Sequence, residues 1–152
     1  MDIGENCEHT LFERNNIMKQ ELDKKLVEKY PKIFADRHKD MRKTAMCWGF
    51  ECGDGWYNII DILCNEIQRH IDHMEKRKTP VEQVVASQVK EKFGGLRFYV
   101  YGGDDTVYAM LDMAESLSLR TCEVCGNVGK PSEGGWIKTL CEEHAKEAGY
   151  LC

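Results

Sequence analysis

Residues 121–144 read TCEVCGNVGKPSEGGWIKTLCEEH, and this stretch decides the architecture of the C-terminal part of the chain. Two pairs of metal-ligand residue types stand at its ends, Cys122 with Cys125 and Cys141 with His144, and two residues separate the members of each pair. That spacing lets both side chains of a pair reach one ion, and three thiolates with one imidazole form a common tetrahedral zinc site. We therefore expect one Zn²⁺ at these four side chains, in a C-terminal treble-clef-like finger.

The expected zinc site is structural. Because protein side chains fill all four positions, no place remains for an activated water, and the ion stabilises the fold instead of catalysing a reaction. Two alternatives stay open: two unrelated cysteine pairings, or an iron centre at the same thiolates, which a histidine ligand disfavours.

The other cysteines show no ligand spacing. They are scattered along the chain: Cys7, Cys47, Cys52, Cys64 and Cys152. Without a secretion signal, clustered cysteines favour metal binding over disulfides, so we expect a reducing cytosol. A second metal site formed by Cys47 and Cys52 with Cys7 and His9 stays open, against the simpler interpretation of small core residues.

Upstream of the finger, residues 84–101 predict a β-hairpin. Two runs rich in β-branched and aromatic residues flank Gly94-Gly95, a pair that accepts the positive φ angles of a tight turn. A two-residue turn at this place would pair Phe93 with Leu96, Glu91 with Phe98 and Val89 with Val100 on one side of the ribbon. The other side would pair Lys92 with Arg97, Lys90 with Tyr99 and Gln88 with Tyr101.

One side of this hairpin is the candidate partner-binding surface. We call it the hairpin face, and it comprises Lys90, Lys92, Arg97, Tyr99 and Tyr101. Such a face could dock on an acidic protein surface, where tyrosine and arginine are typical anchors, or contact phosphate and stacked bases of a nucleic acid. It could also be a solvated strand face covered by the acidic helix of the chain itself.

Three amphipathic helices accompany the hairpin. Apolar residues recur at helical spacing over 15–30, over 56–74 and over 107–117. Pro31 ends the first helix because proline cannot continue it. The second pattern is the strongest, and we expect it to be the central core helix.

The helix starts carry candidate caps. Asp54 in a Gly-Asp-Gly turn is expected to cap the central helix, and Asp104 or Asp105 the third helix. A short strand is expected over 44–50. The elements together predict an α+β fold in which amphipathic helices pack on a β-hairpin or small antiparallel sheet, followed by the finger.

A length of 152 residues fits one compact domain. Within it we expect a loose N-terminus over 1–14, an α+β core over 15–120, and the zinc finger over 121–152 packed on that core. The oligomeric state is left open by the sequence.

Two further groups could form a site: Glu66, His70 and His73 on the central helix, and Glu51, Asp54 and Trp56 around the glycine-rich loop. The group of Glu66, His70 and His73 would need further metal ligands, and none is evident from the sequence. Ordinary residues on the flank of a helix are therefore the simpler interpretation. The second is more typical of a helix start with its tryptophan packed on the core. No phosphate loop, serine elbow or carboxylate pair indicates an enzyme, although an enzyme with a pocket at this loop stays a weaker alternative.

The overall charge and hydropathy argue against a general nucleic-acid coat and against a membrane protein, although a local basic patch stays possible. The formal net charge is −5, whereas general nucleic-acid coats and membrane-surface proteins are normally basic. No stretch approaches the roughly 20 apolar residues needed to cross a bilayer. We therefore expect a cytoplasmic protein without membrane contact.

Three segments together carry a resemblance: ECGDGWYNIIDIL, QVKEKFGGLRFYVYG, and TCEVCG followed by TLCEEH. They resemble a family of small, uncharacterised proteins of bacteriophages and prophages over roughly 48–144. The resemblance implies a phage or prophage origin and a bacterial cytoplasm, and it transfers no catalytic residues. Small phage proteins of this kind often bind and inhibit a host component, including antiviral defence systems. The resulting expectation is a non-enzymatic, zinc-stabilised protein that binds a bacterial host protein, with nucleic-acid binding as the alternative.

Overall fold

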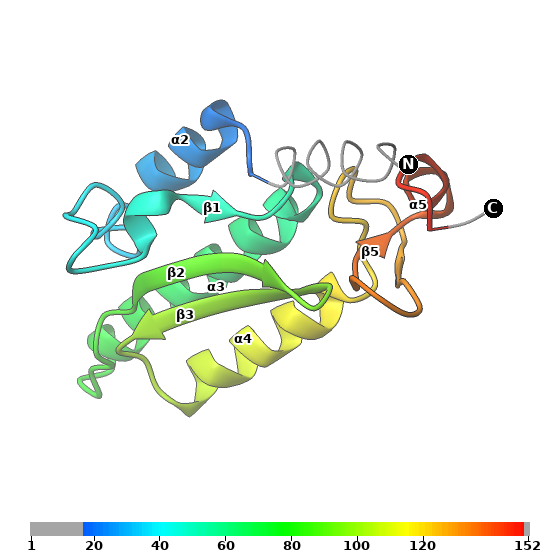
Figure 1. Ribbon diagram of the computed structural model, residues 1–152. Helices are drawn as coiled ribbons and strands as arrows, with labels where there is room; N and C mark the ends of the chain where they lie inside the picture. The colour runs from blue at the N-terminus through cyan, green and yellow to red at the C-terminus, as the bar shows by residue number, and fades with distance from the viewer. Residues whose placement is uncertain (1–16, 151–152) are drawn as a thin grey trace.

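The computed structural model describes residues 17–150, shown in colour in Figure 1. The expected loose segment over 1–14 and the first residues of the expected helix over 15–30 lie outside this range. The described helices are α2 (Gln20–Lys29), α3 (Tyr57–Lys76), α4 (Asp105–Ser118) and α5 (Glu142–Glu147), and the strands are β1 (Phe50–Glu51), β2 (Val85–Lys92), β3 (Gly95–Tyr101), β4 (Lys130–Pro131) and β5 (Thr139–Leu140).

The main sheet has the strand order β1-β2-β3. Strands β2 and β3 form the antiparallel hairpin, whereas β1 pairs with β2 in parallel, with Phe50 opposite Val89. The α+β prediction is confirmed, but the sheet is mixed instead of purely antiparallel. The parallel pair arises because α3 lies between β1 and β2 in the chain and supplies the crossover connection that parallel strands need.

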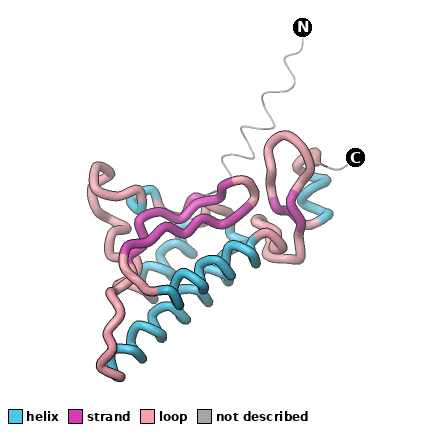
Figure 2. The backbone as a smooth tube through the Cα atoms, turned by 90° about the horizontal axis from the view of Figure 1, so that it is seen from below, coloured by secondary structure: helices cyan, strands magenta, loops and turns pink. Residues whose placement is uncertain are grey.

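Helices α3 and α4 lie on the same side of the hairpin, as the views in Figures 1 and 2 agree. The core between helices and sheet contains Trp56 and Ile67 from the helical side and Val89 and Leu96 from the strands, all with 2% exposure or less. The opposite side of the hairpin carries the hairpin face. The small β4–β5 hairpin and α5 stand at the turn end of β2 and β3 (Figure 1).

The hairpin turn is Phe93-Gly94 and not the expected Gly94-Gly95. Both turn residues have positive φ, 54° and 80°, and Lys92 pairs with Gly95. Over residues 88–92 each partner is thereby displaced by two residues from the expected pairing, so that Lys90 faces Arg97 instead of Tyr99, and beyond an irregularity between Ala86 and Gln88 the displacement is three residues. Because side chains alternate with a period of two, a displacement of two residues leaves the side chains of residues 88–92 and of their partners on the expected side.

The two cap predictions have different outcomes. Asp104 is the N-cap of α4 and accepts a 3.0 Å hydrogen bond from the backbone N–H of Val107, as expected. The prediction for Asp54 is wrong, because no side chain caps α3. Asp54 instead accepts the backbone N–H of Lys19 at 2.9 Å, at the start of α2.

The expected strand over 44–50 is mostly a helical turn. A 3-10 helix occupies Met46–Trp48, and only Phe50 of the expected segment belongs to a strand. Gly49, with φ of 78°, separates the two elements. This conformation is open to glycine and costs other residues strain, so the chain changes direction there.

Candidate metal centre

A tight turn presents the first ligand pair. The N–H of Gly126 donates to the carbonyl oxygen of Cys122 at 2.9 Å, and the N–H of Cys122 donates to that of Asn127 at 2.7 Å. Gly126 has a φ of 80°, as expected for the turn after the second cysteine. The side chain of Cys125 is exposed, whereas that of Cys122 is buried.

The second ligand pair stands at the start of α5. Cys141 is the N-cap of this helix, and its sulfur accepts the N–H of His144 at 3.5 Å. Residues three apart on a helix face the same side, so Cys141 and His144 point together.

The four predicted side chains come together, with all their ligand atoms within 4.8 Å of one another. The Sγ atoms of Cys125 and Cys141 are 3.8 Å apart, and His144 Nδ1 lies 3.6 Å from Cys122 Sγ and 3.1 Å from Cys141 Sγ. A tetrahedral ion with metal–sulfur bonds of about 2.3 Å requires sulfur–sulfur separations of roughly 3.8 Å. The donor set and its spacing therefore fit one four-coordinate metal ion.

The backbone around Cys122 favours the thiolate that a metal needs. Burial alone would raise the pKa of this thiol, but N–H groups of Cys141, Cys125 and Val124 stabilise the anion and bring the pKa below its ordinary value. The second histidine nitrogen, Nε2, lies 3.9 Å from a carboxylate oxygen of Glu147. A carboxylate at this place can orient the ring of a ligand histidine.

A buried group of charges, which we call the Glu–Lys–Glu cluster, joins the metal-bearing segment, residues 121–144, to the sheet. It comprises Glu91 of β2, Glu123 between the first two cysteines, and Lys138 before β5. The ammonium of Lys138 donates to Glu91 Oε2 at 2.7 Å and lies 3.7 Å from Glu123 Oε1. The three side chains are only 8%, 1% and 3% exposed, respectively. Burial raises the pKa of Glu123 to about 7, although Lys138 and the N–H of Gly53 act in the opposite direction.

The glycine-rich loop packs directly on the first cysteine pair. The N–H of Gly55 donates to the carbonyl oxygen of Glu123 at 2.8 Å, and Trp56 Nε1 donates to that of Thr121 at 2.9 Å. A Cβ atom on Gly55 would stand 2.2 Å from the carbonyl oxygen of Cys122, so only glycine fits. The loop is a docking element for the metal segment, and Trp56 is buried in the core as the simpler interpretation expected.

The cluster and this docking contact were missed by the sequence analysis. Charged residues such as Glu123 and Lys138 are normally assigned to the surface, so neither attracts attention. The available signal was a charged residue between two ligand cysteines, together with glycines on both sides of Asp54.

The hairpin face is only partly free for a partner. Tyr99 and Tyr101 are 44% and 62% exposed, and Lys92 is exposed as well. Lys90 Nζ lies 5.9 Å above the ring of Tyr99. Arg97 forms an ion pair with Glu115 of α4, so part of the face is balanced by the acidic helix of the chain.

The other candidate groups do not assemble into a second centre. His70 pairs with Asp104 at 2.9 Å and Glu66 pairs with Arg69, while His73 is exposed. Within residues 17–150, the only group of three or more potential ligands close enough to hold an ion is the Cys3His group.

The remaining candidate ligands, the scattered cysteines and Glu51, have other surroundings. Cys52 is buried and Cys47 half-buried with its thiol on the carbonyl of Thr44, whereas Cys7 and His9 lie outside the described residues. Glu51 is half-buried in β1, where one of its oxygens lies 3.4 Å from the amide of Gln88. Neither the cysteines nor Glu51 extends the metal centre.

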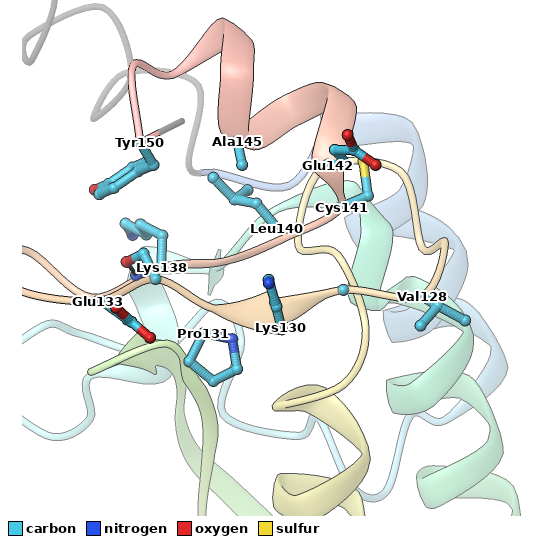
Figure 3. A pocket seen from close by; sticks show the side chains of 12 residues that line it. Val128, Lys130, Pro131, Glu133, Lys138, Leu140, Cys141, Glu142, Ala145 and Tyr150 are labelled. Atoms are coloured by element: carbon cyan, nitrogen blue, oxygen red, sulfur yellow. Dashed lines mark hydrogen bonds between the residues drawn. The ribbon is translucent and has the colours of Figure 1, made fainter. Parts of the chain in front are cut away.

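A cavity of about 670 Å³ lies beside the second ligand pair (Figure 3). Residues of α5 and of the β4–β5 hairpin line it, and Leu140, Ala145 and Pro131 contribute apolar walls. Tyr150 and Lys138 stand close together on one side of it. The ammonium of Lys138 is held by carboxylates, and the cavity presents both polar and apolar walls.

Comparisons with models of protein families, with curated proteins and with solved structures find no match for this chain. No helix in residues 17–150 has the length and apolar character required to span a bilayer. The interpretation of the site therefore depends on its own chemistry.

Proposed function

We propose that this chain is a non-enzymatic, zinc-stabilised interaction protein of phage type. In this proposal it binds a bacterial host protein in the cytoplasm through the hairpin face and inhibits it, with a component of antiviral defence as the candidate class of target. The bacterial host follows from the sequence resemblance, the target class from what small phage proteins commonly bind, and the surface is the hairpin face predicted from the sequence, which the exposure of its tyrosines supports.

The observation that carries the proposal is the pair of exposed tyrosines on β3. Tyr99 and Tyr101 point to the same side of a hairpin whose other side is buried in the core. Rigid, exposed tyrosines supply large contact areas at low entropic cost and are enriched among the residues that dominate binding energy. Lys90 and Lys92 beside them favour a partner with an acidic surface.

Zinc is the proposed metal because its preferences match the donor set. Three thiolates and one imidazole at tetrahedral spacing are typical of structural zinc, whereas calcium and magnesium prefer oxygen ligands. Among the described residues, the four ligands come from two segments that bury little apolar surface of their own, only Cys122 and Leu140. An ion that joins them supplies the stability that such a small segment lacks.

The test is site-specific crosslinking in the bacterial host. A photoreactive residue at Tyr101 should capture one host protein, and the same residue at exposed Asp72 of α3 should not. Tyr99→Ala with Tyr101→Ala should then weaken binding of the captured protein by about a hundredfold, in the range of two interface anchors. Tyr108→Ala is the matched control, because this exposed tyrosine belongs to α4. Equal capture from both positions, or equal loss in the control, would contradict the proposal.

Nucleic-acid binding is the second candidate, favoured by two lysines of β2 and two tyrosines of β3 on one side of the hairpin. It requires affinity for a single-stranded oligonucleotide that falls steeply with salt. Lys90→Glu with Lys92→Glu should abolish that affinity, and Lys24→Glu with Lys25→Glu on α2 serves as the control of equal charge. Salt-independent or undetectable binding would leave the protein partner as the explanation of the hairpin face.

A further inference from the structure

Both backbone polar groups of the turn residue Gly94 are held, the carbonyl by Thr139 of the metal-bearing segment and the N–H by Glu91 of β2. The carbonyl oxygen of Gly94 accepts the hydroxyl of Thr139 at 2.6 Å, and its N–H donates to Glu91 Oε1 at 2.8 Å. The other oxygen of Glu91 is held by Lys138. Residues 138 and 139 lie three and two positions before the ligand Cys141, so the turn is fixed by the chain that delivers a ligand.

The fit at this contact is close. A Cβ atom on Gly94 would stand 3.1 Å from Ile137 Cγ2 and 3.1 Å from Thr139 Oγ1. The glycine thus lets the metal-bearing segment approach the turn within hydrogen-bonding distance. Any larger residue would be strained at the φ of 80° and would require these two side chains to shift.

The turn is held in a conformation that its sequence does not favour. Phe93 adopts a φ of 54°, a strained conformation for residues other than glycine, and its side chain is 67% exposed. An unfavourable conformation persists only where the surroundings determine it. Here the surroundings are the Thr139 hydroxyl and the Glu–Lys–Glu cluster.

The buried ion pair between Lys138 and Glu91 depends on the order of the metal-bearing segment. Lys138 can balance Glu91 only while the segment from Cys122 to Cys141 keeps its place, because removal of one partner from a buried ion pair leaves a costly charge behind. The segment itself depends on the metal for its order. Loss of the ion should therefore release the turn.

We propose that Lys138 and Thr139 couple the metal centre to the hairpin turn, so that the bound metal sets the conformation of Phe93-Gly94 and the position of the hairpin face. The metal centre then regulates the presentation of the binding surface. The coupling itself is a property of the chain, and only its consequence for a partner rests on the proposed function.

The test is residue-resolved amide hydrogen exchange of the full chain with Zn²⁺ and after chelation. Chelation should raise exchange at Gly94 about tenfold or more, while the buried amides of Ile67 in α3 and Ala114 in α4 change less than about threefold. In zinc-loaded Lys138→Met, exchange at Gly94 should already be raised, with an unchanged zinc content. Lys130→Met, an exposed lysine of the same small hairpin, should behave as the unaltered protein.

A second variant covers the case in which Lys138→Met does not fold. Thr139→Val removes only the hydroxyl bond to Gly94 and should also raise exchange at that amide in the presence of zinc. The proposal is overturned if chelation opens Cys122 and Glu123 but leaves Gly94 unchanged, or if all amides in α3 and α4 open together.

The outcomes separate this inference from the proposed function. Coupling without any crosslinked partner at Tyr101 overturns the proposed function and leaves the coupling in place. A partner captured equally with and without zinc, together with unchanged exchange at Gly94, overturns the coupling alone.

Discussion

The backbone N–H of Gly55 lies 2.8 Å from the carbonyl oxygen of Glu123, and this contact leaves no room for a side chain. Gly55→Ala should therefore lower the free energy of unfolding by about 3 kcal/mol, because a methyl group would force two backbone segments apart. Urea unfolding measures the effect. Gly95→Ala is the matched control: its Cβ atom would meet its neighbours at 3.5 Å or more, and the change should stay within about 1 kcal/mol. Similar losses in both variants would contradict the close approach.

The strained turn predicts a stabilising substitution. Phe93→Asn should raise the free energy of unfolding by about 1 kcal/mol, because asparagine tolerates positive φ and favours this type of hairpin turn. Thermal unfolding of the zinc-loaded protein is the measurement. Tyr99→Asn removes an exposed aromatic residue from a strand position without positive φ, and it should destabilise. If both substitutions acted in the same direction, the strain at Phe93 would not be the cause.

The metal ligands predict the zinc content of the protein and the dependence of its stability on zinc. Elemental analysis should find about one zinc per chain, and Cys141→Ser should lose it together with the folded finger. Cys47→Ser changes a half-buried cysteine outside the group and should retain the ion. A chain that unfolds at the same temperature with and without a strong chelator would contradict a structural role for the metal.

The N-cap of α4 predicts loss of stability in acid. Asp104 accepts hydrogen bonds from His70 and from the N–H of Val107, and the first of these is the main reason that its pKa lies below the ordinary value. The stabilisation is therefore complete above the unfolded pKa of the carboxyl group and disappears as the pH falls through the lower folded value. Asp104→Ala should cost about 1 kcal/mol at about pH 6 and much less at about pH 3. The neighbouring Asp105→Ala, which removes no cap, should show no such difference in urea unfolding.

A buried phenol predicts loss of stability in alkali. Tyr30 donates to Asp61 Oδ1 at 2.5 Å, and burial followed by this hydrogen bond raises its pKa from 10.0 to about 12. The protonated phenol is the stabilising form, so its contribution is complete below the unfolded pKa and is lost as the pH rises through the folded one. The unaltered protein should lose stability over this interval. Tyr30→Phe should be less stable at neutral pH yet lose less on going to alkali, and Tyr101→Phe should follow the unaltered protein.

The sequence predicted those elements whose signal is local. The helical period of residues 56–74 and the cap at Asp104 need only neighbours in the chain, and both agree with the structure. The spacing of the Cys3His group is also local within each pair, which is why the four side chains could be named in advance. The ion that would occupy them stays a prediction.

The failures have a common cause in contacts between distant segments. The turn at Phe93-Gly94 prevails over the more favourable Gly94-Gly95 because Thr139 and Glu91 bind the peptide groups of Gly94. Asp54 does not cap the helix that follows it and accepts a hydrogen bond from Lys19 instead, thirty-five residues away in the chain. The turn position and this hydrogen bond cannot be predicted from local propensity, since the partners come into contact only when the chain folds.

The borders of the main sheet have a consequence for behaviour at high concentration. The border strand β1 is two residues long, and the carbonyl of its Phe50 accepts the N–H of Met18. On the β3 side, the N–H of Leu96 is taken by the hydroxyl of Ser118 in α4. A neighbouring strand that approaches either border would thus find the carbonyl of Phe50 and the N–H of Leu96 already hydrogen-bonded, which hinders extension of the sheet at these positions. The protein should stay dispersed in crowded solution where open-edged hairpins would grow into fibrils.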